Sequence, residues 1–203
     1  MTSIRQRYEK LETERTPFLD RARECSKLTL PTLVPDSGHS ASSKFYTPFQ
    51  GIGARGVNNL ASKLLLALVP PNSPFFRLTV DDFKLQELTQ QEGARAEVEE
   101  ALSSIERAVM SEIESSSVRI ATFEALKHLL VAGNVLLYLP ETEGGMRVFH
   151  MDRYVIKRDP MGNALEIITK EDISPETLSP ELQALCDMDQ QEGDVKGYES
   201  VEL

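Results

Sequence analysis

The feature that most constrains the fold is a change of hydrophobic period at Gly133. Before this residue, apolar side chains recur at spacings of three and four, as they do on one face of an amphipathic helix. After it, Asn134 to Leu139 forms a near-continuous apolar run of the kind found in strands. The sequence therefore predicts an α+β protein in which several amphipathic helices pack on a small antiparallel β-meander.

Three helices are predicted before the serine-rich break at 115–117. The first covers Ser3 to Leu28, where Pro17 leaves open whether there are two helices or one kinked helix. The second begins in the glycine run at 51–56 and continues to about Val69, with Leu64 on its apolar stripe. The third covers Ala94 to about Glu114. All three are expected to contribute to the core.

A fourth helix is predicted from Val118 to Ala132. The hydroxyls of Ser115 to Ser117 are expected to cap its beginning, and Gly133 is expected to end it in a left-handed conformation. Its predicted buried face consists of apolar residues on one side of the helix, namely Ile120, Phe123, Leu126 and Leu130.

Strands are predicted by alternating or continuous apolar runs between turn signals, at 75–80, 134–139, 146–157 and 164–170. Turns are expected at 141–145 and 159–163. We divide the chain into a helical and β-meander domain, 1–173, and an acidic segment, 174–203. The segment is expected to contain a short helix at 179–185, an acidic loop at 187–194 and the start of a further strand at Val195, and to continue in a longer protein.

Composition narrows the class of protein. The chain has 203 residues, 40% of them hydrophobic, and a formal net charge of −10. An acidic protein repels phosphates at long range, which argues against a surface that grips nucleic acid or an anionic membrane. The longest apolar runs are too short to span a bilayer, so a soluble protein is expected. Cys25 and Cys186 are expected to be reduced thiols in a cytosolic setting.

The run Gly51 to Gly56 matches the GxGxxG pattern of dinucleotide-binding turns. That pattern requires a strand before it, a helix after it and an acidic residue about 20 positions later. Only the helix is predicted, because Pro48 interrupts the preceding segment and the stretch 68–74 contains no carboxylate. A nucleotide-binding enzyme built on Gly51–Gly56 is therefore a less favoured alternative.

The remaining polar residues suggest no catalytic or metal site. His39, His128 and His150 fall on a loop, a helix and a strand, and no second ligand lies at metal-site spacing. Asp152 and Asp159 are interpreted as turn and strand-end carboxylates, because no third catalytic group accompanies them. We expect no catalytic, cofactor-binding or metal-binding residues, no cofactor and no enzymatic activity.

Two interpretations of the surface remain open. Six bases could form a phosphate-binding patch, although the alternation of the strand works partly against it and a solvated face is favoured: Arg55, Lys63, Arg147, Arg153, Lys157 and Arg158. The number of amphipathic helices also leaves surplus apolar surface, which oligomerisation would cover. A stand-alone helical adaptor that binds a partner through these helices is the alternative.

Two long blocks, residues 46–64 and 123–140, are more specific than any of these patterns. They resemble the N-terminal portion of the head-to-tail connector, or portal, proteins of T7-like short-tailed bacteriophages. Further similarity runs through Arg15-Thr16-Pro17, 113–115, 154–159 and Gly162-Asn163, and covers nearly the whole chain to about Ile173.

The resemblance implies a portal wing-like fold and a structural subunit of a ring of twelve copies. Such a ring lies at the portal vertex of the virion, between head and tail, and is assembled in the host cytoplasm. It passes double-stranded DNA during packaging and ejection without sequence specificity, and its implied partners are capsid and scaffolding proteins, terminase, the tail adaptor and internal core proteins. The family has no catalytic residues or cofactor to carry over, and its stem and clip lie beyond the part that matches this chain.

Overall fold

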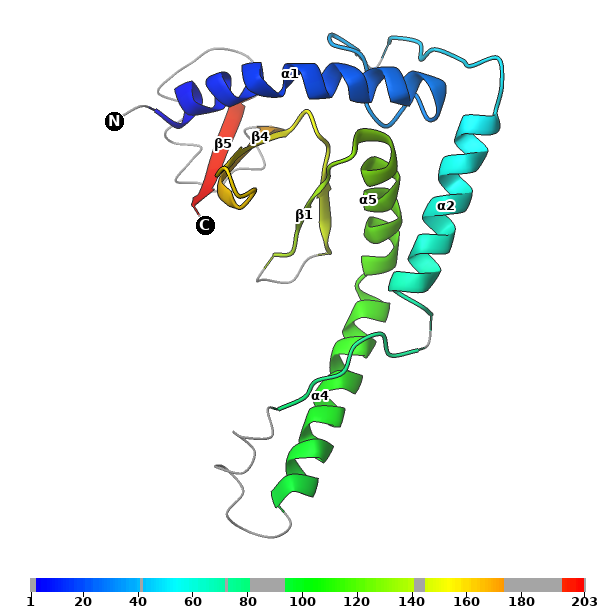
Figure 1. The fold of residues 1–203 in the computed structure, drawn as a ribbon, viewed down its shortest axis with the longest axis vertical. Helices are drawn as coiled ribbons and strands as arrows, with labels where there is room; N and C mark the ends of the chain where they lie inside the picture. The colour runs from blue at the N-terminus through cyan, green and yellow to red at the C-terminus, as the bar shows by residue number, and fades with distance from the viewer. Residues whose placement is uncertain are drawn as a thin grey trace.

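The computed structural model describes residues 3–40, 42–71, 73–80, 94–140, 145–173 and 195–202 (Figure 1). The helices in this part of the chain are α1 (Ile4–Leu28), α2 (Ile52–Leu68), α4 (Ala94–Ser115) and α5 (Val118–Ala132). The strands are β1 (Leu136–Tyr138), β2 (Arg147–Phe149), β3 (Tyr154–Arg158), β4 (Ala164–Ile173) and β5 (Val195–Glu202). The predicted α+β class is confirmed.

The helices form an angular frame around the strands. Figure 1 shows α4 and α5 following one another along a long arm, with α2 beside α5 and α1 crossing above them. The strands lie on the side of α5 away from α2, beneath α1. No described helix is both long enough and apolar enough to cross a membrane.

Helix α1 is a single helix that contains Pro17. A capping box begins it, in which the Ser3 hydroxyl accepts from the Gln6 backbone N–H and the Gln6 side chain accepts from the Ser3 N–H. Thr13 and the residue before the proline, Thr16, donate hydroxyl hydrogen bonds to carbonyls one turn earlier. The helix is continuous through Pro17, where the sequence left open two helices or one kinked helix.

A sharp break separates α4 from α5. Ser117 adopts a left-handed conformation with φ 57°, and it makes no side-chain cap to α5. The hydroxyls of Ser115 and Ser116 donate backward to the Glu112 carbonyl, so the predicted role of these serines as N-terminal caps is wrong. The predicted end of α5 is confirmed, because Gly133 has φ 73° and its N–H donates to the Leu129 carbonyl.

The strands form two antiparallel sheets where the sequence predicted one meander. β1 pairs with β2, and β3, β4 and β5 form a second sheet in that order. The predicted strand 146–157 is divided by a turn in which the Arg153 N–H donates to the His150 carbonyl at 2.9 Å. The second turn is confirmed, with Gly162 at φ 92° and its N–H donating to the Asp159 carbonyl.

The predicted strand at 75–80 is wrong, since these residues belong to no ladder. Instead, the Leu78 N–H donates to the Glu106 carboxylate of α4, so a side chain takes the place of a neighbouring strand. The helix at 179–185, the acidic loop at 187–194 and most of the turn at 141–145 lie outside the described residues. The division of the chain at residue 173 stays a prediction.

The buried residues gather mainly under α1. One cluster consists of Leu19, Ala22, Val34 and Met151, and the other of Tyr8, Val155 and Ile168. On α5 the predicted buried face is only partly correct. Leu126 is buried, but Ile120 is 71% exposed, and Ala125, His128 and Val131 are buried instead. The neighbours α1, α2 and β2 decide which side of α5 is covered.

Candidate functional site

Helix α1 fixes the turn that joins the two sheets. The Arg15 guanidinium donates from Nη1 to the carbonyls of Met151, at 2.7 Å, and Tyr154. The Tyr8 hydroxyl donates to the Asp152 carbonyl at 3.4 Å. Since His150 begins this turn, these contacts also position its backbone.

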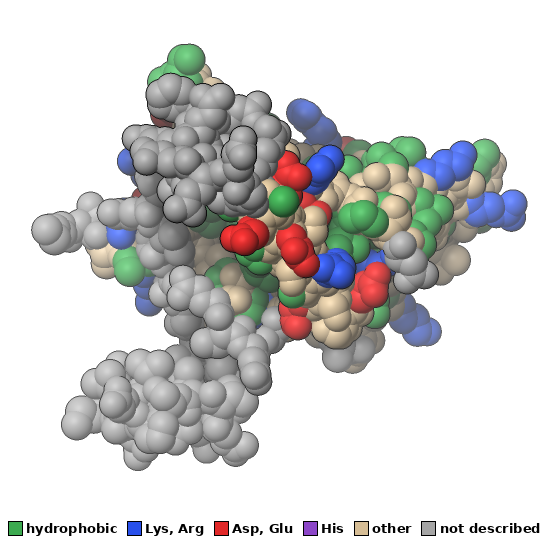
Figure 2. All heavy atoms as spheres, turned by 90° about the horizontal axis from the view of Figure 1, so that it is seen from below, with side chains coloured by type: hydrophobic (Ala, Val, Ile, Leu, Met, Phe, Trp, Pro, Cys, Tyr) green, Lys and Arg blue, Asp and Glu red, His purple; other side chains and the backbone are tan. Residues whose placement is uncertain are grey.

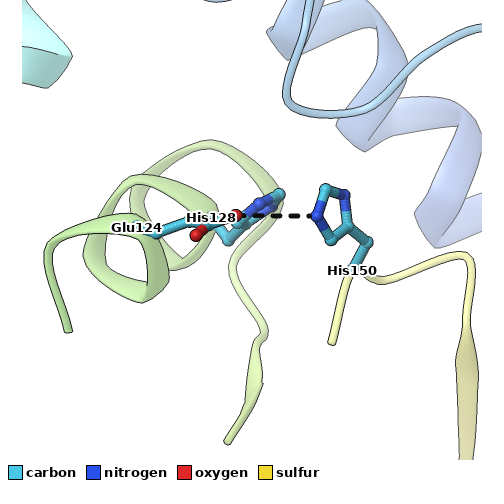
Figure 3. Close-up of side chains that lie close together, drawn as sticks. All are labelled: Glu124, His128 and His150. Atoms are coloured by element: carbon cyan, nitrogen blue, oxygen red, sulfur yellow. Dashed lines mark ion pairs between the residues drawn. The ribbon is translucent and has the colours of Figure 1, made fainter. Parts of the chain in front are cut away.

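Three potential metal ligands meet between α5 and this turn. Glu124 and His128 are one helical turn apart on α5, and His150 faces them from the end of β2 (Figure 3). One potential ligand atom from each residue lies within 4.8 Å of the other two. His150 Nε2 is 3.7 Å from Glu124 Oε1, and the two imidazole centroids are 4.5 Å apart.

The environment of His128 favours its neutral form. The residue is 1% exposed, and neither ring nitrogen has a hydrogen-bond partner. Burial lowers the pKa of His128 and neighbouring His150 lowers it further, while the Glu124 and Asp152 carboxylates act in the opposite direction. A neutral imidazole has a lone pair available for a metal ion, and these three residues are therefore the described ones that could hold one.

This cluster was not predicted from the sequence. The three histidines are scattered along the chain, whereas the fold brings His128 and His150 together and leaves His39 against the ring of Phe45. The available signal was Glu124 and His128 at a spacing of four, which places both on one helix face. The contribution of His150 depends on the turn between two sheets, and no local pattern predicted that turn.

The glycine run lies at the start of α2. Gly51 is the N-cap, and no strand precedes it among the described residues. A Cβ on Gly53 would overlap the Leu28 carbonyl oxygen and approach Thr29 Cα at 3.2 Å, so this glycine allows α2 to meet the end of α1. At Gly51 and Gly56 a Cβ would meet nothing within 4 Å, so no close backbone approach requires glycine at these two positions.

The six bases considered for a phosphate-binding patch lie on separate elements. Arg55 and Lys63 are on α2, whereas the other four are on or beside β2 and β3. α5 lies between α2 and these strands (Figure 1). Arg147 pairs with Glu171 at 2.6 Å, and Arg158 donates to the Gly162 carbonyl. These contacts favour the solvated-face interpretation.

The two aspartates occupy turns, as interpreted from the sequence. Asp159 accepts from the backbone and side-chain nitrogens of Asn163 at 2.7 and 2.9 Å. The side-chain hydrogen bond from Asn163 is the main reason that the pKa of Asp159 is lowered. Asp152 lies in the turn held by α1, and its carboxylate is 4.0 Å from Arg153. Cys25 is an exposed free thiol, and Cys186 lies outside the described residues.

Helices α2 and α4 present two contrasting exposed faces. On α2 the face combines Ile52, Leu60 and Leu66 with the bases Arg55 and Lys63. On α4 it combines Ile105 and Val109 with the acidic side chains of Glu97 and Glu112, whereas Glu99, Glu100 and Glu114 lie on other sides of the helix. Figure 2 shows the acidic side chains gathered at the centre of the lower face, with hydrophobic side chains beside them on the side of α2. Leu64, expected in the core, is half-buried.

Comparisons with known proteins identify the family. The model for "Bacteriophage head to tail connecting protein" matches residues 1–203. The chain is 42% identical over 200 residues to the portal protein of Escherichia phage T7, covering 97% of this chain and 37% of that protein. It is 38% identical over an alignment of 217 residues to the portal protein of Enterobacteria phage T3, covering 96% and 40% of the two chains.

A third relative, the portal protein of Enterobacteria phage SP6, is 34% identical over 173 residues, which cover 85% of this chain and 33% of the relative. The chain thus spans well under half the length of these relatives. The family model nevertheless covers all of its residues. The chain therefore belongs to the bacteriophage head to tail connecting protein family.

Proposed function

We propose that this chain is the N-terminal, wing-like part of a portal subunit, a structural protein without enzymatic activity. Copies form a closed ring, of twelve subunits, at the vertex between head and tail. Family membership supports the portal role, and the relatives named as portal proteins match this chain over most of its length. The rest of each relative's sequence lies outside the part that aligns with this chain.

The proposal of a ring rests on apolar side chains of α2 and α4 that remain exposed in a single chain. On α2, Leu60 and Leu66 are 47% and 56% exposed, and Ile52 lies on the same side. On α4, Ile105 and Val109 are also exposed. Contiguous exposed apolar surface of this kind marks an interface with another protein. In a ring, a second copy of the chain would cover this apolar surface.

The charges on these two faces indicate how the copies meet. Arg55 and Lys63 are the charged residues of α2, which contains no acidic residue. The described charged side chains of α4 are acidic except for one base, Arg107. We infer that α2 of one subunit contacts α4 of the next. Two different faces in contact make a head-to-tail interface, which generates a ring when the rotation closes.

The acidic balance also suits a conduit for DNA. A net charge of −10 disfavours phosphate binding, whereas a basic surface would hold DNA non-specifically at about 10⁻⁴ to 10⁻⁶ M. DNA is therefore proposed to pass without sequence specificity while the ring contacts capsid and scaffolding proteins, terminase, the tail adaptor and internal core proteins. The ring would be assembled in the host cytoplasm and retained in the virion.

The test is the assembly state of the product of the complete reading frame that encodes this chain. Native mass spectrometry and electron microscopy should show closed rings with a central hole. A protein that remains monomeric under assembly conditions would contradict the proposal and favour the stand-alone adaptor. Saturable nucleotide binding that is lost in Gly56→Val, where a Cβ would meet nothing within 4 Å, would instead revive the enzyme based on Gly51–Gly56.

A charge exchange tests the α2–α4 contact. Replacing Arg55 and Lys63 with Glu should weaken ring formation, because like charges would then face one another. Replacing Glu97 and Glu112 with Lys should do the same. Combining both pairs of changes in one chain should restore rings at low salt. If the combined variant assembles no better than either parent, α2 and α4 are not partners.

A further inference from the structure

We propose that Glu124, His128 and His150 form a binding site for one zinc ion, which joins α5 to the turn between β2 and β3. This site goes beyond the ring function, because it concerns the inside of a single subunit. Figure 3 shows the three side chains directed toward one another from these two elements. Each contributes one potential ligand atom, and these atoms lie within 4.8 Å of one another.

The distances suit capture of a small cation. Zinc binds His nitrogen at 2.0–2.1 Å and carboxylate oxygen at 2.0–2.2 Å, which places tetrahedral ligand atoms about 3.3 Å apart. The 3.7 Å between His150 Nε2 and Glu124 Oε1 is already near this value. Both side chains are nearly half exposed, at 42% and 48%, so small rotations can bring them closer. The ligand at the buried end, His128, is held in place by packing.

His128 supplies an independent reason to expect a ligand. Its ring is 1% exposed, and neither Nδ1 nor Nε2 has a hydrogen-bond partner. A buried polar atom without a partner is energetically costly, and such atoms are uncommon in native proteins. A metal ion bound at one ring nitrogen would give that atom a partner.

The donor types select the kind of metal. Two imidazoles and one carboxylate suit zinc and similar divalent transition metals. Magnesium and calcium bind six or more oxygen atoms. In this cluster only Glu124 offers oxygen, because the other two residues are histidines. Three protein ligands leave a fourth position for water. Because His150 belongs to a turn already held by Arg15 and Tyr8 of α1, the ion would connect α5 to that fixed frame.

The experiment uses the complete chain without a polyhistidine tag, stripped of metal with a chelator and titrated with Zn²⁺ by calorimetry. We expect one Zn²⁺ per chain with a dissociation constant in the micromolar range or below. His150→Ala and Glu124→Gln should each weaken binding by about 100-fold, as expected for the loss of one ligand. His39→Ala and Glu114→Gln are the matched controls, and both should bind Zn²⁺ as the parent does.

A second measurement separates a metal site from a purely structural role of these residues. Zn²⁺ should raise the melting temperature of the parent chain by an amount that grows with the logarithm of the free zinc concentration divided by the dissociation constant, and should raise that of His150→Ala much less. Circular dichroism without metal checks that His150→Ala remains folded, and if it unfolds, Glu124→Gln at the exposed end of the cluster decides. Absence of stoichiometric binding, or equal Zn²⁺ affinity in the parent and Glu124→Gln, would overturn the proposal.

Discussion

Two regions of the molecule differ in how their apolar side chains are covered. Between α1 and the β3–β4 sheet, Tyr8, Val155 and Ile168 are buried almost completely by the chain itself. Along α2 and α4, Leu66 and Ile105 remain more than half exposed. Both regions have regular amphipathic sequences, so a hydrophobic period identifies an apolar face without revealing whether the same chain covers it.

Polar contacts strengthen the contrast. Arg7 pairs with the buried Glu166 at 2.8 Å, and Arg15 donates to two carbonyls of the turn between the sheets. These contacts connect α1 to strands more than a hundred residues later. The α1–sheet region is therefore expected to set the stability of the subunit, while the exposed faces of α2 and α4 are expected to set assembly.

The largest effect is expected from a buried charge in the first region. Ile168→Asp places a carboxylate where the native side chain is 0% exposed, which should cost several kcal/mol, comparable with the whole stability of a domain. Urea denaturation should show a chain that is unfolded or nearly so. Its counterpart, Leu66→Glu on α2, should change the unfolding free energy by about 0.5 kcal/mol or less, yet should prevent ring formation.

These two variants distinguish a face of the internal core from an interface with another subunit. If Leu66→Glu destabilised the isolated chain as strongly as Ile168→Asp, the exposed face of α2 would belong to an internal core. If Leu66→Glu assembled normally, that face would not be an interface.

Loss of the α1 contact with the turn should have the next largest effect. Arg15→Ala removes a charged donor that is largely buried, and it leaves the carbonyls of Met151 and Tyr154 without this partner. Hydrogen bonds to charged groups contribute about 1.5–3 kcal/mol, so a loss of that size is expected in urea denaturation. Arg5→Ala, which removes an exposed pairing with Glu9, should cost about 0.5 kcal/mol or less. Equal losses would show that the Arg15 contact contributes little.

A glycine pair tests where α2 meets α1. Gly53→Ala should destabilise the chain by about 1–3 kcal/mol, because the new methyl group would press on backbone atoms of Leu28 and Thr29. Gly56→Ala should stabilise it by up to about 1 kcal/mol, since alanine is the better helix former and the position is open within the chain. Opposite shifts in the urea midpoint are expected. Shifts of the same sign would contradict the close approach at Gly53.

Local signals account for what the sequence predicted well. The boundaries of α5 were predicted because Gly133 ends the helix by its own left-handed preference and the apolar period changes there. The start of α2 and the 159–163 turn likewise depend on glycines and neighbouring residues. Each of these features is determined within a few positions along the chain.

The errors share a different cause, which is a partner distant in sequence. The segment 75–80 has a strand-like pattern, but a Glu106 side chain receives its N–H at Leu78. The turn that divides 146–157 is held by Arg15, and that turn brings His150 to His128. Contacts between residues so far apart in sequence cannot be predicted from a local pattern. Of the three candidate metal ligands, the sequence therefore offers a signal only for Glu124 and His128, which are four residues apart on one helix.

The smallest effect near neutral pH is expected at Tyr154. This side chain is 2% exposed and its hydroxyl has no hydrogen-bond partner, so Tyr154→Phe should change stability by less than about 1 kcal/mol at pH 7. Burial raises the pKa of Tyr154 to about 12, although Arg15 and Arg158 act to lower it.

An unfolded tyrosine ionises near pH 10. Between pH 10 and 12 the unfolded state therefore loses its proton before the folded state does, and the stability of the folded protein falls as the pH rises. The parent chain should therefore lose about 1 kcal/mol more than Tyr154→Phe between pH 9 and 11, measured by urea denaturation. Tyr138→Phe, which removes an exposed hydroxyl, is the matched control, and identical slopes for the parent and Tyr154→Phe would show that Tyr154 is not buried in solution.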